Sequence, residues 1–214
     1  TFEQSAYRFF ENGDATTVTT ALGLQDSAIS LSTNGEAFRI RMLMHVDSSE
    51  LVQDGENFKL QFASKSGTCD TSFIGETYTD ITGSTAIAYN NNSPSDNAPL
   101  TPNITLDPFH ASDTTIPQTY EEANNFTNSV NALVEGVDGE WDFALFDNAG
   151  GSLASYCFRV VKSDNTPLTT YTVIPEITAS TAYAITGTYI SNDFNTTATQ
   201  VFNVIEWNWS RTNP

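Results

Sequence analysis

The sequence predicts an all-β protein: an antiparallel β-sandwich, immunoglobulin-like or jelly-roll-like, with extended terminal strands. Apolar and polar residues alternate with a period of two in several segments, as they do in half-buried strands. The chain has 14 Phe, 8 Tyr and 3 Trp beside abundant Thr, and these residues favour strands. Turn-rich loops separate the short strand-like segments, and no amphipathic helical stretch of ordinary length occurs.

The clearest alternation occupies residues 38–46 and predicts a half-buried strand. Turn signals flank it at Asn34-Gly35 and Asp54-Gly55, and a second alternating segment follows at residues 58–62. We expect these two strands to be antiparallel neighbours. The first strand has an apolar face formed by Phe38, Ile40, Met42, Met44 and Val46, and its other face holds Arg39, Arg41 and His45.

The remaining elements follow in order along the chain. The segment Phe2 to Glu11 is strand-like, and residues 68–122 predict long loops with short strands, followed by a helical turn or two around residues 120–129. A second hairpin is expected from residues 141–145, a turn at 148–151 and residues 156–160. One more strand is expected at residues 171–178, where Pro175 favours an edge or a strand end.

A chain of 214 residues is long enough for one large sandwich domain, which we place at residues 1–178. Residues 179–214 then form a C-terminal extension of two or three strands, which cannot bury their faces alone. The extension either completes its own sheet or is donated to the sheet of a neighbouring subunit. The candidate donor-strand residues are Phe202, Val204, Ile205, Trp207 and Trp209, and the segment Phe2 to Glu11 is the other candidate donor.

The charge and hydropathy of the chain limit its partners and its location. A formal charge of −18 repels phosphate backbones and anionic lipids, so we expect no nucleic acid partner. No window approaches the ~18 apolar residues that would span a bilayer, so no membrane insertion is expected. The composition is typical of an extracellular or cell-surface protein, and we expect the chain to be a mature form from which a signal peptide has been removed.

The two cysteines, Cys69 and Cys157, predict one structural disulfide in an oxidising compartment, with two buried free thiols as the alternative. Such a bridge would close a long loop, and in the chain-entropy model it would stabilise the fold by ~4–5 kcal/mol. Five Asn-x-Ser/Thr motifs are candidate glycosylation sites. These motifs begin at Asn91, Asn103, Asn125, Asn195 and Asn208.

Residues able to support catalysis are scarce, and we expect no enzyme activity. His45 and His110 are the two histidines; His45 is expected to be structural and His110 to lie on the surface. The sequence lacks clustered Cys and His at zinc-ligand spacing and has no phosphate-binding Gly-rich loop. No pair of carboxylates stands out for glycoside hydrolysis.

Calcium is the candidate cofactor, because acidic and amide oxygens gather in three segments, although solvated tight turns use the same residues. The three segments are residues 96–97, 138–142 and 192–195. The basic residues of the strands are expected to form cross-strand ion pairs, and Lys59 could form an isopeptide crosslink beside an Asn and a carboxylate. These basic residues are Arg8, Arg39, Arg41, Lys59 and Arg159.

Seven segments of the chain resemble a module of large predicted surface proteins of uncultivated, candidate-phyla bacteria. These segments are residues 4–12, 38–46, 58–63, 118–125, 141–148, 156–161 and 171–178, so the resemblance covers roughly residues 3–178. The family has no known activity or binding residues to transfer. The resemblance implies a secreted, repeated module in a cell envelope or an appendage.

We therefore expect a structural subunit of an extracellular filament, pilus or surface layer, in which copies of the chain assemble by strand donation. The alternative is a carbohydrate-binding or adhesion module of a larger surface protein, in which Trp141, Trp207 and Trp209 stack on sugar rings and glycans are the partners.

Overall fold

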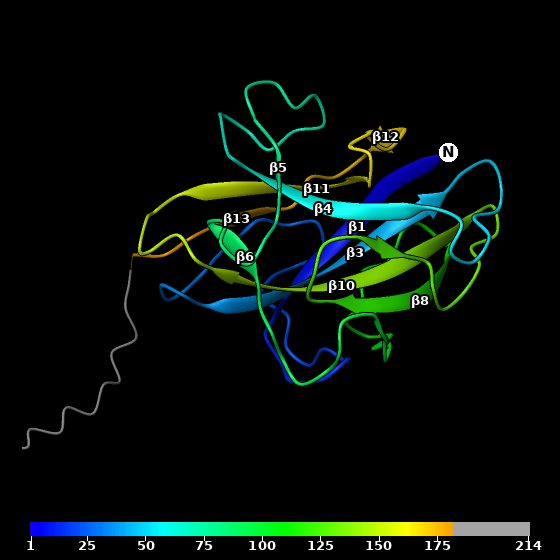
Figure 1. Ribbon diagram of the computed structural model, residues 1–214, viewed down its shortest axis with the longest axis horizontal. Helices are drawn as coiled ribbons and strands as arrows, with labels where there is room; N and C mark the ends of the chain where they lie inside the picture. The colour runs from blue at the N-terminus through cyan, green and yellow to red at the C-terminus, as the bar shows by residue number, and fades with distance from the viewer. Residues whose placement is uncertain (182–214) are drawn as a thin grey trace, which may run out of the picture. The chain divides into compact units, whose positions relative to one another are not determined.

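The computed structural model describes residues 1–181, which form an all-β domain of two sheets (Figure 1). These residues contain no helix, so the predicted all-β class is confirmed. Residues 182–214 lie outside the described part, and the predicted donor strand with its five candidate residues falls there. No helix among the described residues is long and apolar enough to cross a membrane.

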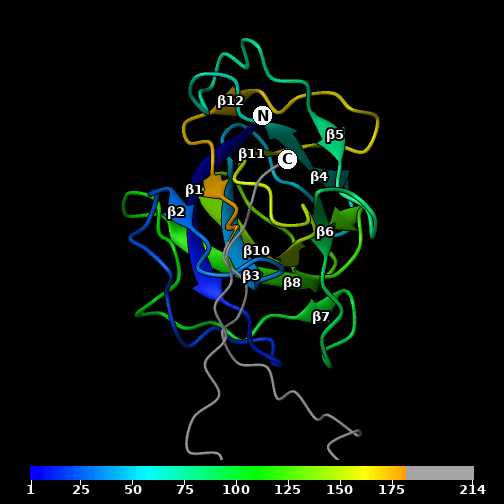
Figure 2. The same ribbon diagram turned by 90° about the vertical axis from the view of Figure 1, so that its left-hand side faces the viewer.

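The first sheet has seven strands in the order β12-β1-β3-β10-β8-β7, with β6 also paired to β10. β12 lies beside the start of β1 (Figure 2). The sheet is mixed, because β1 pairs in parallel with β12 and β10 pairs in parallel with β8. Its strands are β1 (Phe2–Glu11), β3 (Ala37–Val46), β6 (Ile87–Tyr89), β7 (Ala98–Pro99), β8 (Thr114–Glu121), β10 (Val137–Asp147) and β12 (Thr170–Tyr171).

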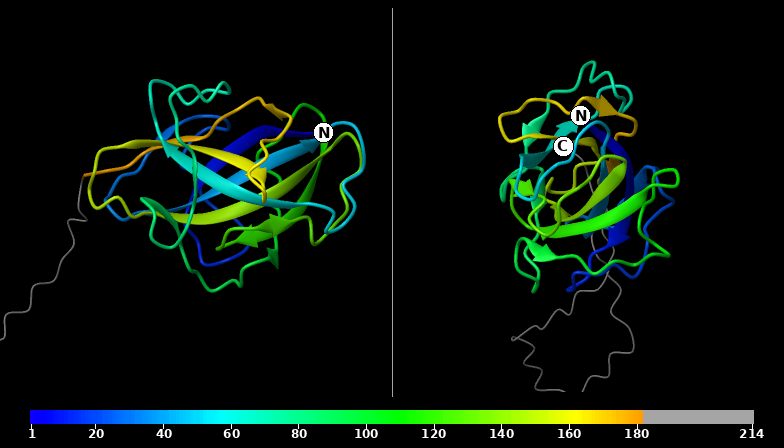
Figure 3. Two further views of the ribbon diagram at one scale, coloured as in Figure 1. Left: turned by 45° about the horizontal axis from the view of Figure 1, so that its top comes forward. Right: turned by 90° about the vertical axis from the view of Figure 1, so that its right-hand side faces the viewer.

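The second sheet has six strands in the order β2-β13-β11-β4-β5, with β9 also paired to β4. Only β2 and β13 are parallel in it. β4 and β11 form a layer separate from that of β3, β10 and β8, and two further views show the same layers (Figures 1 and 3). Its strands are β2 (Ile29–Ser30), β4 (Asn57–Ser64), β5 (Thr79–Asp80), β9 (Phe126–Thr127), β11 (Ser155–Lys162) and β13 (Glu176–Thr178).

The hydrophobic core lies between the two sheets and is rich in aromatic rings. The predicted apolar face of β3, from Phe38 to Val46, is fully buried in it. Phe38 of the first sheet meets Phe158 of the second with their ring centroids 6.4 Å apart, in an edge-to-face arrangement. Complete burial of such a side chain contributes ~1.5–3 kcal/mol, so these rings hold the two layers together.

Both predicted hairpins are wrong in their pairing. β3 belongs to the first sheet and β4 to the second, and the same separation holds for β10 and β11. The connections at residues 47–56 and 148–154 are longer than a two-residue hairpin turn, so they can cross the ~10 Å between sheets. The apolar faces of successive strands thus meet across the core and not along one sheet.

Other predictions need smaller corrections. The helical turns expected around residues 120–129 are absent there, since this segment contains the end of β8 and the strand β9. The strand expected at residues 171–178 is divided into the end of β12 and β13, and Pro175 lies between them as its missing N–H requires. The strand expected at Phe2 to Glu11 is present as β1.

The outer face of the first sheet is covered and not solvated. Arg39 and Arg41 of β3 are fully buried there, although the alternation predicted an exposed polar face. Arg39 donates to the carbonyl oxygens of Gly13 and Ala15, and Arg41 donates to the carbonyl oxygen of Thr101. Two segments therefore cover this face: residues 13–18 and the β7–β8 loop, residues 100–113.

Candidate metal centre

Four metal-binding side chains from three segments converge at the covered outer face of the first sheet. His45 of β3 and Asp138 of β10 are direct cross-strand neighbours, so both side chains point to the same face. His110 and Asp113 come from the end of the β7–β8 loop. One donor atom from each residue lies within 4.8 Å of the others.

The distances among these atoms suit a small cation better than hydrogen bonds. Nδ1 of His45 lies 3.4 Å from Asp113 Oδ2 and 3.5 Å from Asp138 Oδ1. Nδ1 of His110 lies 3.3 Å and 3.5 Å from the same two oxygens. Among the described residues, neither nitrogen has a hydrogen-bond partner, although both are buried.

These four separations match the edges of a tetrahedral coordination shell. Zinc bonds to His nitrogen and carboxylate oxygen of ~2.0–2.2 Å place neighbouring ligands ~3.3–3.6 Å apart. The two carboxylates also contribute a charge of −2, which a divalent cation balances. Imidazole ligands favour zinc and its transition-metal neighbours over the calcium expected from the sequence.

Asp138 is the buried member of the set. Burial raises the pKa of its carboxyl above the ordinary value, while the Ser5 hydrogen bond and the two histidines lower it. Ser5 donates to Oδ1 at 2.8 Å from the position where the register of β1 shifts against β3. This irregularity turns Ser5 toward the covered face, where it fixes the orientation of the Asp138 carboxylate. Oδ2 of Asp138 is buried without a hydrogen-bond partner in the described residues.

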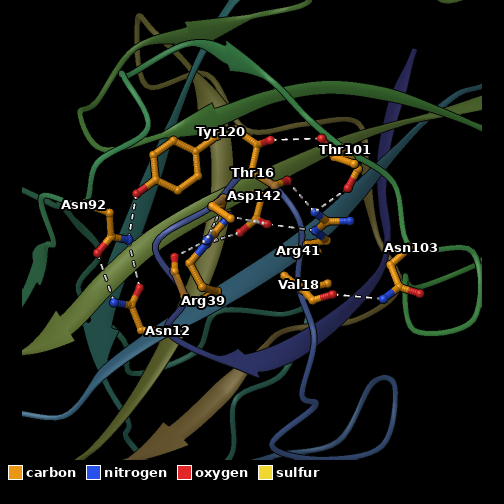
Figure 4. A network of polar contacts seen from close by, with 12 residues as sticks. Asn12, Thr16, Val18, Arg39, Arg41, Asn92, Thr101, Asn103, Tyr120 and Asp142 are labelled. Carbon is orange, nitrogen blue, oxygen red and sulfur yellow. Dashed lines mark hydrogen bonds and ion pairs between the residues drawn. The ribbon is translucent and has the colours of Figure 1, made fainter.

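A buried ion network occupies the same face farther along β3 and β10 (Figure 4). Arg39 and Arg41 both donate to the fully buried Asp142, at 2.7–2.8 Å. The Arg39 guanidinium lies 4.4 Å from the ring centroid of Tyr120. Arg41 also pairs with Asp107 of the β7–β8 loop. The predicted cross-strand ion pairs are present here, but they are buried and anchor the covering loop.

Glu140 lies on β10 between Asp138 and Asp142, and its side chain is fully buried. The nearest cation is Arg41, whose Nη1 lies 3.7 Å from Glu140 Oε2, beyond hydrogen-bond distance. Burial raises the pKa of Glu140 to about 8, and Arg41 acts in the opposite direction. Both carboxyl oxygens lack a hydrogen-bond partner in the described part of the chain.

The predicted disulfide between Cys69 and Cys157 is confirmed, with Cα atoms 5.5 Å apart and a sequence separation of 88. Cys157 lies in β11, and Cys69 lies in the segment between β4 and β5. Arg159, two residues after Cys157, packs against the Phe73 and Tyr78 rings of that segment. The bridge and this contact together fix the segment to the outer face of the second sheet.

The glycosylation motifs lie in different environments. Asn91 and Asn125 are exposed, whereas the Asn103 side chain is half-buried and donates to the carbonyl oxygen of Val18. Asn195 and Asn208 lie outside residues 1–181. Glycan attachment stays a prediction.

The expected calcium segments are arranged differently from binding loops. Residues 138–142 form part of a strand whose carboxylates face His45, Arg39 and Arg41. Asp96 accepts the backbone N–H groups of Glu122 and Ala123, so its carboxylate joins its loop to the segment that follows β8. The segment 192–195 falls beyond the described residues.

The structure bears on two other predicted roles. Trp141 is 1% exposed and donates to the carbonyl oxygen of Thr127, so it fills the core and cannot stack on a sugar. Lys59 forms an ion pair with Asp80 at 2.8 Å on a partly exposed edge. Trp207 and Trp209 lie outside the described residues.

Sequence reasoning missed the candidate metal centre because its four residues are far apart in the chain. It assigned His45 a structural role and His110 a surface position, and the structure brings the two imidazole rings to 5.1 Å. The available signal was the placement of His45 and Asp138 on the polar faces of two alternating strands. The contribution of His110 and Asp113 depends on how the β7–β8 loop folds back, which no local pattern encodes.

Comparison with known proteins adds no family assignment. No protein-family model matches the chain, and no curated protein matches it.

Proposed function

We propose that this chain is a non-catalytic, secreted β-sandwich module whose functional fold is held by a divalent transition-metal ion, with zinc as the preferred ion. The convergence of His45, His110, Asp113 and Asp138 at tetrahedral spacing is the observation that carries the proposal. Four protein ligands fill a tetrahedral shell, and closed shells of this kind are typical of structural zinc sites.

The ion would act as a long-range crosslink. It would join the end of the β7–β8 loop, through His110 and Asp113, to β3 and β10, through His45 and Asp138. The disulfide ties a loop to the second sheet, and the metal would do the same on the first sheet. A metal site that is formed only in the folded chain contributes its binding free energy to folding.

The cell-surface setting belongs to this proposal. The disulfide supports an oxidising compartment, and the charge of −18 supports a soluble module in contact with cations. Assembly of copies into a filament or surface layer by a terminal strand is proposed on the sequence pattern of residues 201–209.

Zinc titration tests the metal site. Chelator-treated protein should bind one Zn²⁺ per chain by isothermal titration calorimetry, and the midpoint of thermal unfolding should rise with zinc concentration. Asp113→Asn should weaken zinc binding by more than the roughly 10–100-fold that changes outside the ligand shell cost. Among the described residues, the Asp113 side chain forms ion pairs with the two histidines alone, so the variant should fold normally.

Asp54→Asn is the matched control, because Asp54 is exposed and its positive φ of 56° suits Asn equally well. The control should bind zinc as the parent chain does. Equal zinc affinity in Asp113→Asn and the parent, or binding of Ca²⁺ in preference to Zn²⁺, would show that this cluster is not a transition-metal site.

A further inference from the structure

The sequence contains two Asn-Gly pairs, Asn12-Gly13 and Asn34-Gly35, and the structure places their asparagines in different environments. Glycine has no Cβ, so its main-chain nitrogen can approach the side chain of the asparagine before it. Asparagine is a thermolabile residue, and attack of that nitrogen on the side-chain amide is one route by which it is lost. The two pairs have comparable chemistry in the unfolded chain, so a difference between them in the native protein comes from the fold.

The side chain of Asn12 is held at both of its amide atoms. Its Nδ2 donates to Asn92 Oδ1 at 3.0 Å, and its Oδ1 accepts from Asn92 Nδ2 at 2.9 Å. Asn92 is fixed in turn, because its Nδ2 also donates to the Tyr120 hydroxyl (Figure 4). Rotation of the Asn12 amide toward Gly13 would break two hydrogen bonds, so the fold opposes the reaction at this pair.

The side chain of Asn34, in the connection between β2 and β3, lacks this restraint. Its Oδ1 has no hydrogen-bond partner among residues 1–181, so rotation of the amide breaks no bond at this atom. Gly35 is exposed, has a positive φ of 77°, and has open space where a Cβ would lie. Within the described chain, the Gly35 N–H donates to no backbone carbonyl oxygen. The attacking nitrogen and the amide that it attacks are therefore both accessible.

We propose that Asn34 is a site of spontaneous deamidation and that the Asn92 hydrogen bonds protect Asn12 from the same reaction. The main-chain nitrogen of Gly35 loses its proton to solvent and forms a bond with Cγ of Asn34. The Cγ–Nδ2 bond breaks, and Nδ2 leaves as ammonia after taking up a proton from solvent. Water then opens the five-membered imide at either of its carbonyl groups, which gives aspartate or isoaspartate. Neither step needs an oxidant, a reductant or an enzyme.

Deamidation would change a connection that carries other contacts. One carboxylate oxygen of Glu36 accepts the N–H groups of Ser32 and Thr33, and the new carboxylate would lie two residues before it. The carbonyl oxygen of Ser32 accepts from the Ser180 hydroxyl at 3.3 Å, so the same connection contacts the end of the described chain. Isoaspartate also adds one methylene group to the backbone shortly before β3. The reaction involves none of the four proposed metal ligands, so it is independent of the metal centre.

Peptide mapping by mass spectrometry tests the proposal. The full chain is incubated at mildly alkaline pH, folded in one sample and unfolded in guanidinium with reductant in the other. Conversion adds about 1 Da to the peptide concerned, and enzymatic methylation detects isoaspartate. We expect similar rates at Asn12 and Asn34 in the unfolded chain. In the folded chain, Asn34 should react at least ~10-fold faster than Asn12, because two hydrogen bonds restrain the Asn12 amide.

Two variants assign the effect. Asn92→Ala removes both restraints, so it should raise the Asn12 rate at least ~10-fold in the folded protein and leave the Asn34 rate unchanged. Asn34→Gln keeps an amide group that would have to close a six-membered ring, so position 34 should stay unmodified. The comparison within the parent chain needs no variant. Equal rates at Asn12 and Asn34 in the folded parent, or no product at Asn34 in the time that the unfolded chain needs to react, would overturn the proposal.

Discussion

Asp142 holds two arginines in a site from which water is excluded. Asp142→Asn would leave Arg39 with a neutral partner at zero exposure, while Arg41 would keep its ion pair with Asp107. Breaking a buried ion pair by removing one partner costs ~3–5 kcal/mol, because an uncompensated charge remains. We expect the free energy of unfolding, measured with urea, to fall by this amount in Asp142→Asn and to stay unchanged in the control Glu135→Gln, whose side chain is exposed. A loss below ~1 kcal/mol would mean that the network is solvated in solution.

Glu121, the last residue of β8, is a further buried carboxyl group. Burial raises its pKa to about 8, and its hydrogen bond from Thr119 lowers the pKa by a smaller amount. The folded protein therefore retains a proton that the unfolded chain releases near pH 4.3. Between these values stability falls as pH rises, and the full penalty is present above about pH 8.

Glu121→Gln removes this penalty. Between pH 5 and pH 9, the free energy of unfolding should fall less in the variant than in the parent chain. At pH 9 the variant should be more stable than the parent by on the order of a few kcal/mol. Chemical unfolding at several pH values measures this difference. Parallel pH profiles for the two proteins would contradict a raised pKa at this position.

Ser5 acts on the proposed metal centre through Asp138. Ser5→Ala removes the 2.8 Å hydrogen bond to Oδ1 and leaves all four ligands in place. Changes outside the ligand shell typically lower metal affinity by roughly 10–100-fold. We therefore expect the zinc affinity of Ser5→Ala to fall by about 10-fold. Zinc calorimetry measures it, and unchanged affinity would remove Ser5 from the site.

The individual residues of the core were predictable, and those of the outer face were not. The apolar face of β3 followed directly from its period of two, and Phe38 and Val46 are fully buried as expected. The same period placed Arg39 and Arg41 toward water. Their burial depends on the covering segments at residues 13–18 and 100–113, which lack periodicity.

At the scale of elements, strand positions were predictable while strand partners were not. Asp54-Gly55 was correctly placed between two strands, since Asp54 has a positive φ of 56°. A turn signal shows where the chain reverses, but it does not show whether the next strand pairs beside the last one or crosses to the other sheet. The length of the connection and the burial of both faces of the strand decide which partner the strand takes. The burial of a face depends on the whole fold.

The segment between β4 and β5 is fixed by the disulfide and by the Arg159 contacts. A Cys69→Ser/Cys157→Ser variant should lose up to ~4–5 kcal/mol of unfolding free energy in the chain-entropy model. Parent and variant are compared by urea unfolding without reductant. Equal stability would show that the aromatic contacts with Arg159 fix this segment on their own.

At the scale of the molecule, residues 1–181 supply all thirteen described strands and a closed core. A chain ending at Thr181 should therefore unfold cooperatively at the same temperature as the full chain. Light scattering across a concentration series then tests the proposed strand donation. Filaments formed by the full chain alone would support a donor strand in residues 182–214, and monomers in both cases would exclude it.

The pairing of β1 with β12 has a consequence for how the chain folds. Glu3 is the partner of Thr170, so the first strand finds its outer neighbour only when nearly all of the domain has been made. β3 pairs with β10 across roughly a hundred residues, and the average contact is therefore remote in sequence. Such a topology folds slowly, within milliseconds to seconds or longer. Slow folding of this kind would allow the proposed export to precede folding, with the disulfide forming afterwards.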